Sequence, residues 1–159
     1  MDIRARQDAD LVPLVEVLRR THEGGYPAHW PAAPEQWLSP PGLLAAWSAM
    51  VDGVPVGHVG LTAPDPDAPP LVTRLLVHPD HRGRGIADAL MATVEEAAGP
   101  LAAGARGAAV LRLDVTEDTP GAWRLYERRG WGLTGRRPAD WRMPDGTVPV
   151  VRWYEKRLG

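Results

Sequence analysis

A short run of glycine and arginine residues is the part of this sequence best suited to chemistry. His81–Ala87 reads His-Arg-Gly-Arg-Gly-Ile-Ala and lies between a predicted strand and a predicted helix. The first turn of a helix offers main-chain N–H groups without partners and the positive end of the helix dipole. Gly83 and Gly85 let the main chain approach a ligand closely, and Arg82 and Arg84 add charged donors. The run therefore predicts a cradle for an anion such as a phosphate.

Three kinds of glycine-rich turn are alternatives for this run. A dinucleotide site requires Gly-x-Gly-x-x-Gly, but Asp88 stands where the third glycine would be. A nucleotide-binding Walker loop requires Gly-Lys-Ser/Thr, which the run lacks. The third alternative is an ordinary turn between a strand and a helix, with arginines that are merely solvated.

The apolar pattern around the run predicts the elements that position it. Leu71–Val77 is predicted to be a strand whose side chains alternate between its two faces. One face would carry Leu71, Thr73, Leu75 and Val77, and the other face the remaining three residues. After a loop at Pro79–Gly85, apolar residues from Ile86 to Ala97 recur at helical spacing. We expect Gly99-Pro100 to end that helix.

The rest of the chain is expected to form a mixed α+β sheet that is not doubly wound. Asp8 or Asp10 is expected to cap the first helix, and Asp52-Gly53 is a strong hairpin signal. The proline-rich segment Tyr26–Gly42 is expected to form loops and short helical turns. The remaining predicted elements are strands at Ile3–Arg6, Ala45–Val51, Pro55–Thr62, Ala109–Val115, Trp131–Thr134 and Val148–Tyr154, and helices from Leu11 to about Gly24 and from Pro120 to about Gly130.

Composition limits the classes of function. The 159 residues carry a net charge of −2, which gives no reason to expect a nucleic-acid or membrane partner. The absence of cysteine excludes disulfides, thiolate metal sites and thiol nucleophiles, and it fits a reducing cytoplasm. Neither a leader sequence nor a long apolar run is evident, so we expect a single cytoplasmic domain over residues 1–159.

Two motifs resemble those of the GNAT superfamily of acetyl-CoA-dependent N-acetyltransferases. The segment from Leu75 to Ala87 closely resembles the family's acetyl-CoA segment, whose pattern Gln/Arg-x-x-Gly-x-Gly/Ala is met by Arg82, Gly85 and Ala87. The second signature, Ala-x-x-Leu-Tyr-x-x-x-Gly-Phe, is matched by four residues, with a tryptophan in place of Phe: Ala122, Leu125, Tyr126, Gly130 and Trp131. The motifs occur in the family's order and at about its spacing.

The resemblance implies a fold and a donor substrate. The fold would be GNAT-like, with a central mixed, mostly antiparallel six- to seven-stranded sheet flanked by about four helices. Acetyl-CoA would be the acyl donor, with no metal, and the main chain of Leu75, Leu76 and Val77 would pair with its pantetheine arm. The family places the other cofactor contacts at Arg82, Gly83, Arg84, Gly85, Ile86, Ala87, Thr119 and Ala122. Thr119 departs from the pattern, because the family usually has Asn there.

The same resemblance implies direct acetyl transfer to an amine in a ternary complex. A main-chain N–H near Leu76 or Val77 would polarise the thioester carbonyl, and Tyr126 would be the general acid that protonates the leaving thiolate. The base stays open between an ordered water and several side chains: Glu23, His22, His29, His58 and Asp114. The neighbouring pair His78 and His81 lacks further ligands, so no metal site is predicted.

Aromatic residues are expected to line the site for the amine acceptor. The resemblance places that site between the proline-rich segment and the last β–β loop, where aromatic walls suit an apolar or cationic group. The candidates are Tyr26, His29, Trp30, Trp37 and Trp141, with Asp145 beside Trp141. The alternative is that these rings only fill the core.

Several questions stay open in the sequence. The acceptor is a small-molecule or peptide amine of unspecified identity, and a homodimer is compatible with the sequence. A non-catalytic acyl-CoA-binding sensor or interaction module with the same fold is the alternative to an enzyme. The presence of Tyr126 favours the enzyme, because a binding protein does not need a proton donor.

Overall fold

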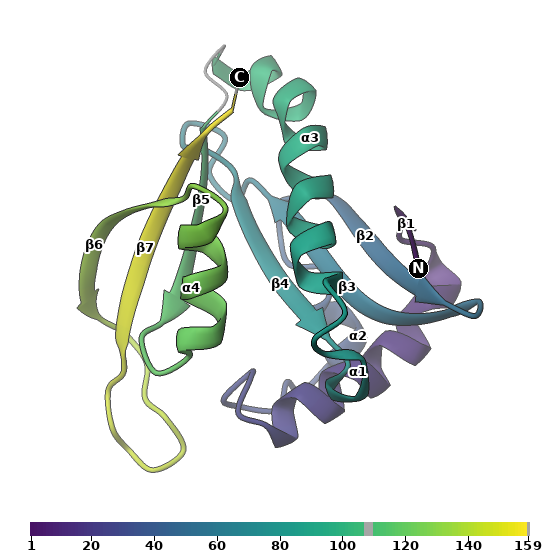
Figure 1. Cartoon of the computed structure of the whole chain (residues 1–159). Helices are drawn as coiled ribbons and strands as arrows, with labels where there is room; N and C mark the ends of the chain where they lie inside the picture. Colours follow the sequence, from purple (N-terminus) through teal and green to yellow (C-terminus); the bar gives the residue numbers. More distant parts are fainter. Residues whose placement is uncertain (107–109, 159) are drawn as a thin grey trace.

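Two groups of strands meet in one seven-stranded sheet that opens in its middle (Figure 1). The computed structural model describes residues 1–106 and 110–158. The strand order is β1-β2-β3-β4-β5-β7-β6, and every neighbouring pair is antiparallel except β4 with β5. The elements are β1 (Asp2–Ala5), α1 (Leu11–Glu23), α2 (Pro34–Trp37), β2 (Leu43–Val51), β3 (Val54–Thr62), β4 (Leu71–Val77), α3 (Ile86–Arg106), β5 (Val110–Thr116), α4 (Pro120–Arg128), β6 (Gly132–Pro138) and β7 (Val150–Arg157).

Helices cover the sheet on both faces (Figure 1). α1 and α2 pack on one face of β3 and β4, where Leu14, Leu18 and Leu38 are buried against Leu76. α3 packs on the opposite face and buries Leu90 and other apolar residues in the main core, to which α4 also contributes. The mixed α+β architecture predicted from the sequence is thereby confirmed.

Local signals account for several of the observed boundaries. α1 ends at Gly24, as its apolar spacing and the following glycine predict. Asp52 and Gly53 both adopt positive φ, 51° and 77°, which is the conformation that a two-residue hairpin turn between β2 and β3 requires. β4 coincides with the predicted strand. The predicted start of β5 at Ala109 lies outside the described residues.

Two boundary predictions are wrong. α3 continues through Gly99-Pro100 to Arg106, because the alanines and Leu101 that follow favour helix enough to offset the N–H that proline lacks. Asp10 does not cap α1 with its side chain. Its buried carboxylate instead accepts hydrogen bonds from Arg4 at 2.7 and 2.9 Å and from Ser48 at 2.9 Å, so it ties the start of α1 to the sheet.

The strict alternation predicted for β4 is also wrong at one point. Thr73 pairs with Gly60 and Leu76 with His58, so Arg74 and Leu75 together lie opposite the single residue between them on β3. This is a β-bulge. It brings Val72 to the same face as Leu75 and Val77, although the sequence pattern placed it on the other.

None of the helices within the described residues is long and apolar enough to cross a bilayer. Nor do those residues contain a group of three or more His, Cys, Asp or Glu side chains that could hold a metal ion.

Candidate active site

The split between β4 and β5 leaves one strand edge without a strand partner. The two strands run parallel, but their register includes one pair, Leu71 with Arg112, and the Arg112 N–H donates to the Pro70 carbonyl at 3.0 Å. Beyond that point the strands diverge (Figure 1). Within the described residues, the edge of β4 that faces β5 at Leu75–Val77 therefore has unpaired main-chain groups, which an extended ligand could pair with.

The glycine-rich loop begins α3 at the same end of the split. Gly83 and Gly85 each have a φ of 77°, and a Cβ atom added at either would meet no protein atom within 4 Å. The Ala89 N–H donates to the Gly85 carbonyl at 3.0 Å, which is the first hydrogen bond of the helix. The N–H groups of the first helical residues therefore have no helical acceptor. The open space and these donors fit a phosphate group.

The side chains of the loop serve different purposes. Ile86 is buried in the main core, and Ala87 packs partly against it, so their side chains hold the helix while their N–H groups stay available. Arg82 and Arg84 are exposed, and Arg84 Nη1 lies 3.1 Å from Nδ1 of His81. Both guanidinium groups can therefore reach an anion over the helix start.

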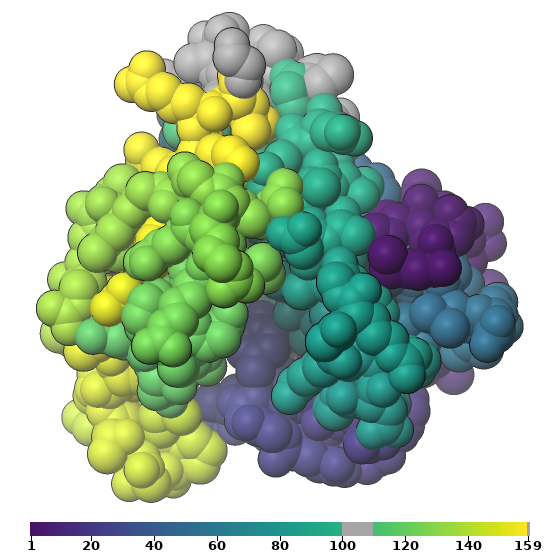
Figure 2. Space-filling view, viewed as in Figure 1, coloured from purple at the N-terminus to yellow at the C-terminus, as the bar shows by residue number. Residues whose placement is uncertain are grey.

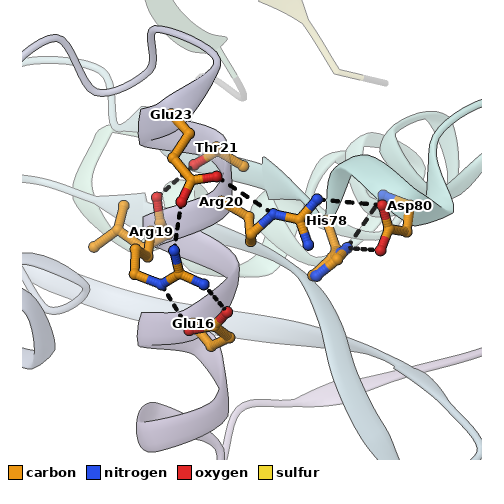
Figure 3. Close-up of polar contacts among 8 residues, drawn as sticks. Glu16, Arg19, Arg20, Thr21, Glu23, His78 and Asp80 are labelled. Carbon is orange, nitrogen blue, oxygen red and sulfur yellow. Dashed lines mark hydrogen bonds and ion pairs between the residues drawn. The ribbon is translucent and has the colours of Figure 1, made fainter.

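A chain of ion pairs joins this loop to α1 (Figure 3). Arg20 contacts Glu23 on its own helix at 3.6 Å and Asp80 in the loop at 3.3 Å. The Asp80 main-chain N–H donates to His78 Nδ1 at 3.1 Å. Arg19 pairs with both Glu16 and Glu23. Glu23 is thus engaged by two arginines on the exposed surface.

Tyr126 lies on the other side of the split, on α4. Its side chain is 7% exposed, and the rings of Trp131 and Tyr154 lie 6.4 and 6.3 Å away. Its hydroxyl makes no hydrogen bond to any described residue. Burial raises the pKa of Tyr126, and Tyr26 and Asp114 raise it further. Tyr126 therefore keeps its proton at neutral pH, and none of the described residues accepts that proton.

Thr119 and Ala122 occupy the start of α4. The Thr119 hydroxyl donates to the Thr116 carbonyl at 2.7 Å. Its proton is therefore already used, so Thr119 can only accept a hydrogen bond from a ligand, unlike the Asn amide that the family usually has. Ala122 packs partly against the core.

Two of the candidate bases, His58 and His22, lie beside main-chain carbonyl groups. His58 is fully buried, with Nδ1 2.8 Å from the Arg74 carbonyl and Nε2 3.0 Å from Arg6 Nη1. Burial lowers the pKa of His58 to about 4, so it is a neutral histidine within the sheet. His22 lies 2.6 Å from the Pro27 carbonyl.

Asp114 is the candidate base that adjoins Tyr126. It projects from β5 on the face opposite Leu113, is exposed, and forms no ion pair with a described side chain. Desolvation by the walls of the split raises its pKa, and three guanidinium groups oppose that shift: Arg74, Arg112 and Arg137. Asp114 therefore has a raised pKa and interacts electrostatically with Tyr126.

The predicted acceptor residues come together from two segments. The Tyr26 ring meets Trp37 edge-on at 6.2 Å. The His29 ring lies 6.4 Å from Trp141, and His29 Nε2 is 2.6 Å from the Arg142 carbonyl, so the α1–α2 segment touches the β6–β7 loop. Tyr26, Trp30 and Trp141 are 42%, 41% and 39% exposed, and the ring of Trp30 lies 5.6 Å from that of His22.

Arg74 was not predicted as a site residue. It has a φ of 57° at the bulge of β4, a left-handed conformation that costs about 1–2 kcal/mol for a residue with a side chain. It interacts electrostatically with Tyr26 and Asp114. Electrostatic interactions therefore link four residues, since Arg74 and Tyr126 each interact with both Tyr26 and Asp114. A charged residue within the apolar alternation of Leu71–Val77 was the available sequence signal.

The surface is hollowed along the split. Figure 2 shows a recess between the green lobe of α4 and the teal lobe of α3, with the purple-blue segment between α1 and α2 behind it. A second recess of about 660 Å³ lies at the rim, between the β5–α4 turn with Glu117 and Asp118 and the β6–β7 loop from Met143 to Val150. The split is the candidate active site, because Tyr126, Asp114 and the glycine-rich loop adjoin it.

Solved structures of acetyltransferases share this fold. The ribosomal-protein-S18-alanine N-acetyltransferase from Escherichia coli superposes with a TM-score of 0.77 at 18% identity, over 99% of this chain and 94% of that one. NAA60 from Arabidopsis thaliana in complex with acetyl-CoA superposes with a TM-score of 0.73 at 18% identity, over 99% and 98%. At these identities the likeness establishes the fold.

Sequence comparison establishes the family. The mycothiol acetyltransferase of Kineococcus radiotolerans is 43% identical over 81 residues, which are 50% of this chain and 24% of that protein, so the match spans about a quarter of its length. The model of the acetyltransferase (GNAT) family matches residues 11–131, from α1 to the end of the second motif. The chain thus belongs to the acetyltransferase (GNAT) family.

Proposed function

We propose that residues 1–159 form one catalytic domain that transfers an acetyl group from acetyl-CoA to a primary amine, directly, in a ternary complex. One observation carries the proposal: an unpaired strand edge and an open helix start adjoin one side of the split, while a base and an acid, Asp114 and Tyr126, adjoin the other. The complex of NAA60 with acetyl-CoA on the same fold supports the choice of donor.

The donor would bind mainly through main-chain groups. The pyrophosphate would lie over Gly83–Ala87, with the guanidinium groups of Arg82 and Arg84 beside it. The pantetheine arm would pair with the β4 edge at Leu75–Val77 as an added strand. Thr119 and Ala122 would border the arm from α4.

Catalysis would combine positioning with charge stabilisation. A main-chain N–H near Leu76 or Val77 would donate to the thioester oxygen as negative charge develops on it, which is typically worth about 3 kcal/mol. Holding the amine and the thioester together at reacting distance contributes up to about 7–11 kcal/mol.

One proton would be removed from the acceptor amine, and another would be donated to the leaving sulfur. Asp114 would accept a proton from the acceptor ammonium, and the freed electron pair would attack the thioester carbonyl carbon. When the carbon–sulfur bond breaks, Tyr126 would donate its proton to the departing sulfur. The attacking nitrogen would lose its second proton to solvent, so the products are an N-acetylated amine, CoA thiol and one proton. Solvent would return the proton from Asp114 to Tyr126.

Acetyl-CoA binding tests the donor assignment. Added acetyl-CoA should raise the melting temperature, because a ligand at 100 times its Kd stabilises the folded state by about 2.7 kcal/mol. NAD and ATP serve as controls and should have much smaller effects. The proposal is wrong if millimolar acetyl-CoA gives neither a melting shift nor heat in calorimetry. Thiol release that depends on an added amine separates the enzyme from an acyl-CoA sensor.

A further inference from the structure

Arg74 is held rigidly on the face of the sheet that carries α1 and α2. Its guanidinium lies 4.0 Å above the Trp37 ring. Nε donates to the Trp37 carbonyl at 3.0 Å, and Nη1 lies 3.3 Å from Thr73 Oγ1. The bulge that gives Arg74 its left-handed backbone also turns this side chain away from the main core. A backbone outlier that the surrounding structure maintains is a reason to look for function.

The charge of Arg74 has no anion in contact with it in the part of the chain that the structure describes. Among the described residues, no carboxylate lies within 4 Å of its guanidinium, and Nη2 has no hydrogen-bond acceptor. Burial lowers the pKa of Arg74, although Tyr26 and Asp114 oppose that effect from a distance. A half-buried cation without a contacting anion is unfavourable. A ligand with a negative group at this point would relieve that cost.

The surroundings of Asp114 carry an excess of positive charge. Arg74, Arg112 and Arg137 all act on its carboxylate. Arg112 and Arg137 stand over the Trp153 ring, at 4.9 and 4.8 Å from its centroid. Arg112 also pairs with Glu155 at 3.4 Å. Three guanidinium groups thus face two carboxylates. This surface repels a purely cationic acceptor and attracts one that carries a negative charge.

We infer that the acceptor is a small amine that also carries a carboxylate, an amino acid in the chemical sense, and that Arg74 binds this carboxylate while Asp114 receives the amine. The inference rests on the proposed function and deepens it by naming the acceptor class. The planar guanidinium, fixed by Trp37 and Thr73, can bind a carboxylate in two parallel hydrogen bonds. Arg74 and Asp114 lie three and two residues beyond Leu71 and Arg112, the pair that joins β4 to β5, so they stand on opposite sides of the split and could bind the two ends of such a molecule.

The first test compares matched acceptors on the wild-type protein. The twenty proteinogenic amino acids and their carboxamides are offered with saturating acetyl-CoA, and thiol release is measured. At least one amino acid should show a kcat/KM tenfold or more above that of its carboxamide. The inference is wrong if the carboxamides are acetylated as fast as the acids. It is also wrong if none of the acids is acetylated.

The second test assigns the preference to Arg74. Arg74→Gln should lower kcat/KM for the preferred acid by tenfold or more and change that of its carboxamide by less than threefold. Arg74→Lys, which keeps the charge without the planar fork, should restore part of the loss. Arg124→Gln is a matched control, because Arg124 also stands over a tryptophan, Trp123 at 5.2 Å, but on the exposed side of α4. An equal loss for acid and carboxamide in Arg74→Gln would make the role structural and contradict the inference.

A binding measurement adds a readout besides turnover. In the presence of CoA, the N-acetylated form of the preferred acid should raise the melting temperature of the wild type and of Arg74→Lys but not of Arg74→Gln. The two proposals fail separately. If acetyl-CoA itself does not bind, the proposed function is wrong. If acetyl-CoA binds and amines are acetylated without preference for a carboxylate, only the acceptor class and the role of Arg74 are wrong.

Discussion

The two sides of the split between β4 and β5 are built in different ways. The proposed donor side comes from one continuous segment, β4 with the loop and helix start that follow it, and it offers mainly main-chain groups. The proposed acceptor side comes from three elements and the segment between α1 and α2, and it offers side chains: Tyr26, Arg74, Asp114 and Tyr126. The donor side should therefore depend on backbone conformation, and the acceptor side on single functional groups.

This difference suggests which changes each side tolerates. A main-chain cradle binds through N–H groups that every residue except proline carries, so its side chains can change. Selection of an acceptor requires particular side chains, which the structure collects from distant parts of the sequence. The four predictions below test this separation, and each should change one side and leave the other intact.

The largest effect is expected at Asp114. Asp114→Asn removes the proposed base, and an ammonium with a pKa near 10 is neutral in only about one molecule in 10³ at pH 7. Turnover at pH 7 should fall about 10³-fold and recover about tenfold for each pH unit up to the pKa of the amine. In the wild type, activity should fall as pH drops through the raised pKa of Asp114, above its usual 3.8.

Acetyl-CoA affinity is the control for that variant and should not change. A pH–rate profile of Asp114→Asn that coincides with the wild-type profile would remove Asp114 from the mechanism and return the choice of base to an ordered water.

Tyr126 should show the next largest effect. Tyr126→Phe keeps the ring among Trp131 and Tyr154 but removes the proton donor, so turnover should fall about 10²-fold while melting temperature and acetyl-CoA affinity barely change. The loss should shrink for a donor whose thiol is more acidic, because that leaving group needs less protonation. An equal loss for both donors would indicate positioning in place of acid catalysis.

A smaller effect, on binding, is expected at Gly85. Gly85→Val introduces a Cβ at a φ of 77° and into the space assigned to the pyrophosphate, so acetyl-CoA affinity should fall about tenfold, or 1.4 kcal/mol. Gly53→Val is a matched control, since Gly53 has the same φ and equally open surroundings in the β2–β3 turn. If a folded Gly85→Val binds acetyl-CoA normally, the phosphates bind elsewhere.

The smallest effects are expected at the rim of the acceptor side. Trp141→Ala removes the ring contact to His29, and Trp30→Ala removes the one to His22, so acceptor KM should rise about threefold to tenfold with acetyl-CoA affinity unchanged. Calorimetric titration with acetyl-CoA and acceptor kinetics measure the two effects separately. Unfolding of both variants would instead favour the reading that these rings fill the core.

Sequence reasoning performed best where a local rule decides the structure. The strand at Leu71–Val77, the hairpin at Asp52-Gly53 and the end of α1 follow from alternation, turn chemistry and a terminal glycine. It was weaker where tertiary contacts override local preference. The Asp10 carboxylate pairs with Arg4 and Ser48 and does not cap α1, and the bulge at Arg74 breaks an alternation that looked regular.

By itself, the sequence determined the family, the order of the elements and the loop proposed to hold the donor, because those depend on residues adjacent in the chain. The tertiary structure decided which acidic and aromatic side chains meet. It buried His58 within the sheet, left Asp114 beside Tyr126 and brought Arg74 to them through a bulge. No spacing in the sequence encodes those distances, since they depend on how far two parallel strands diverge after a single point of pairing.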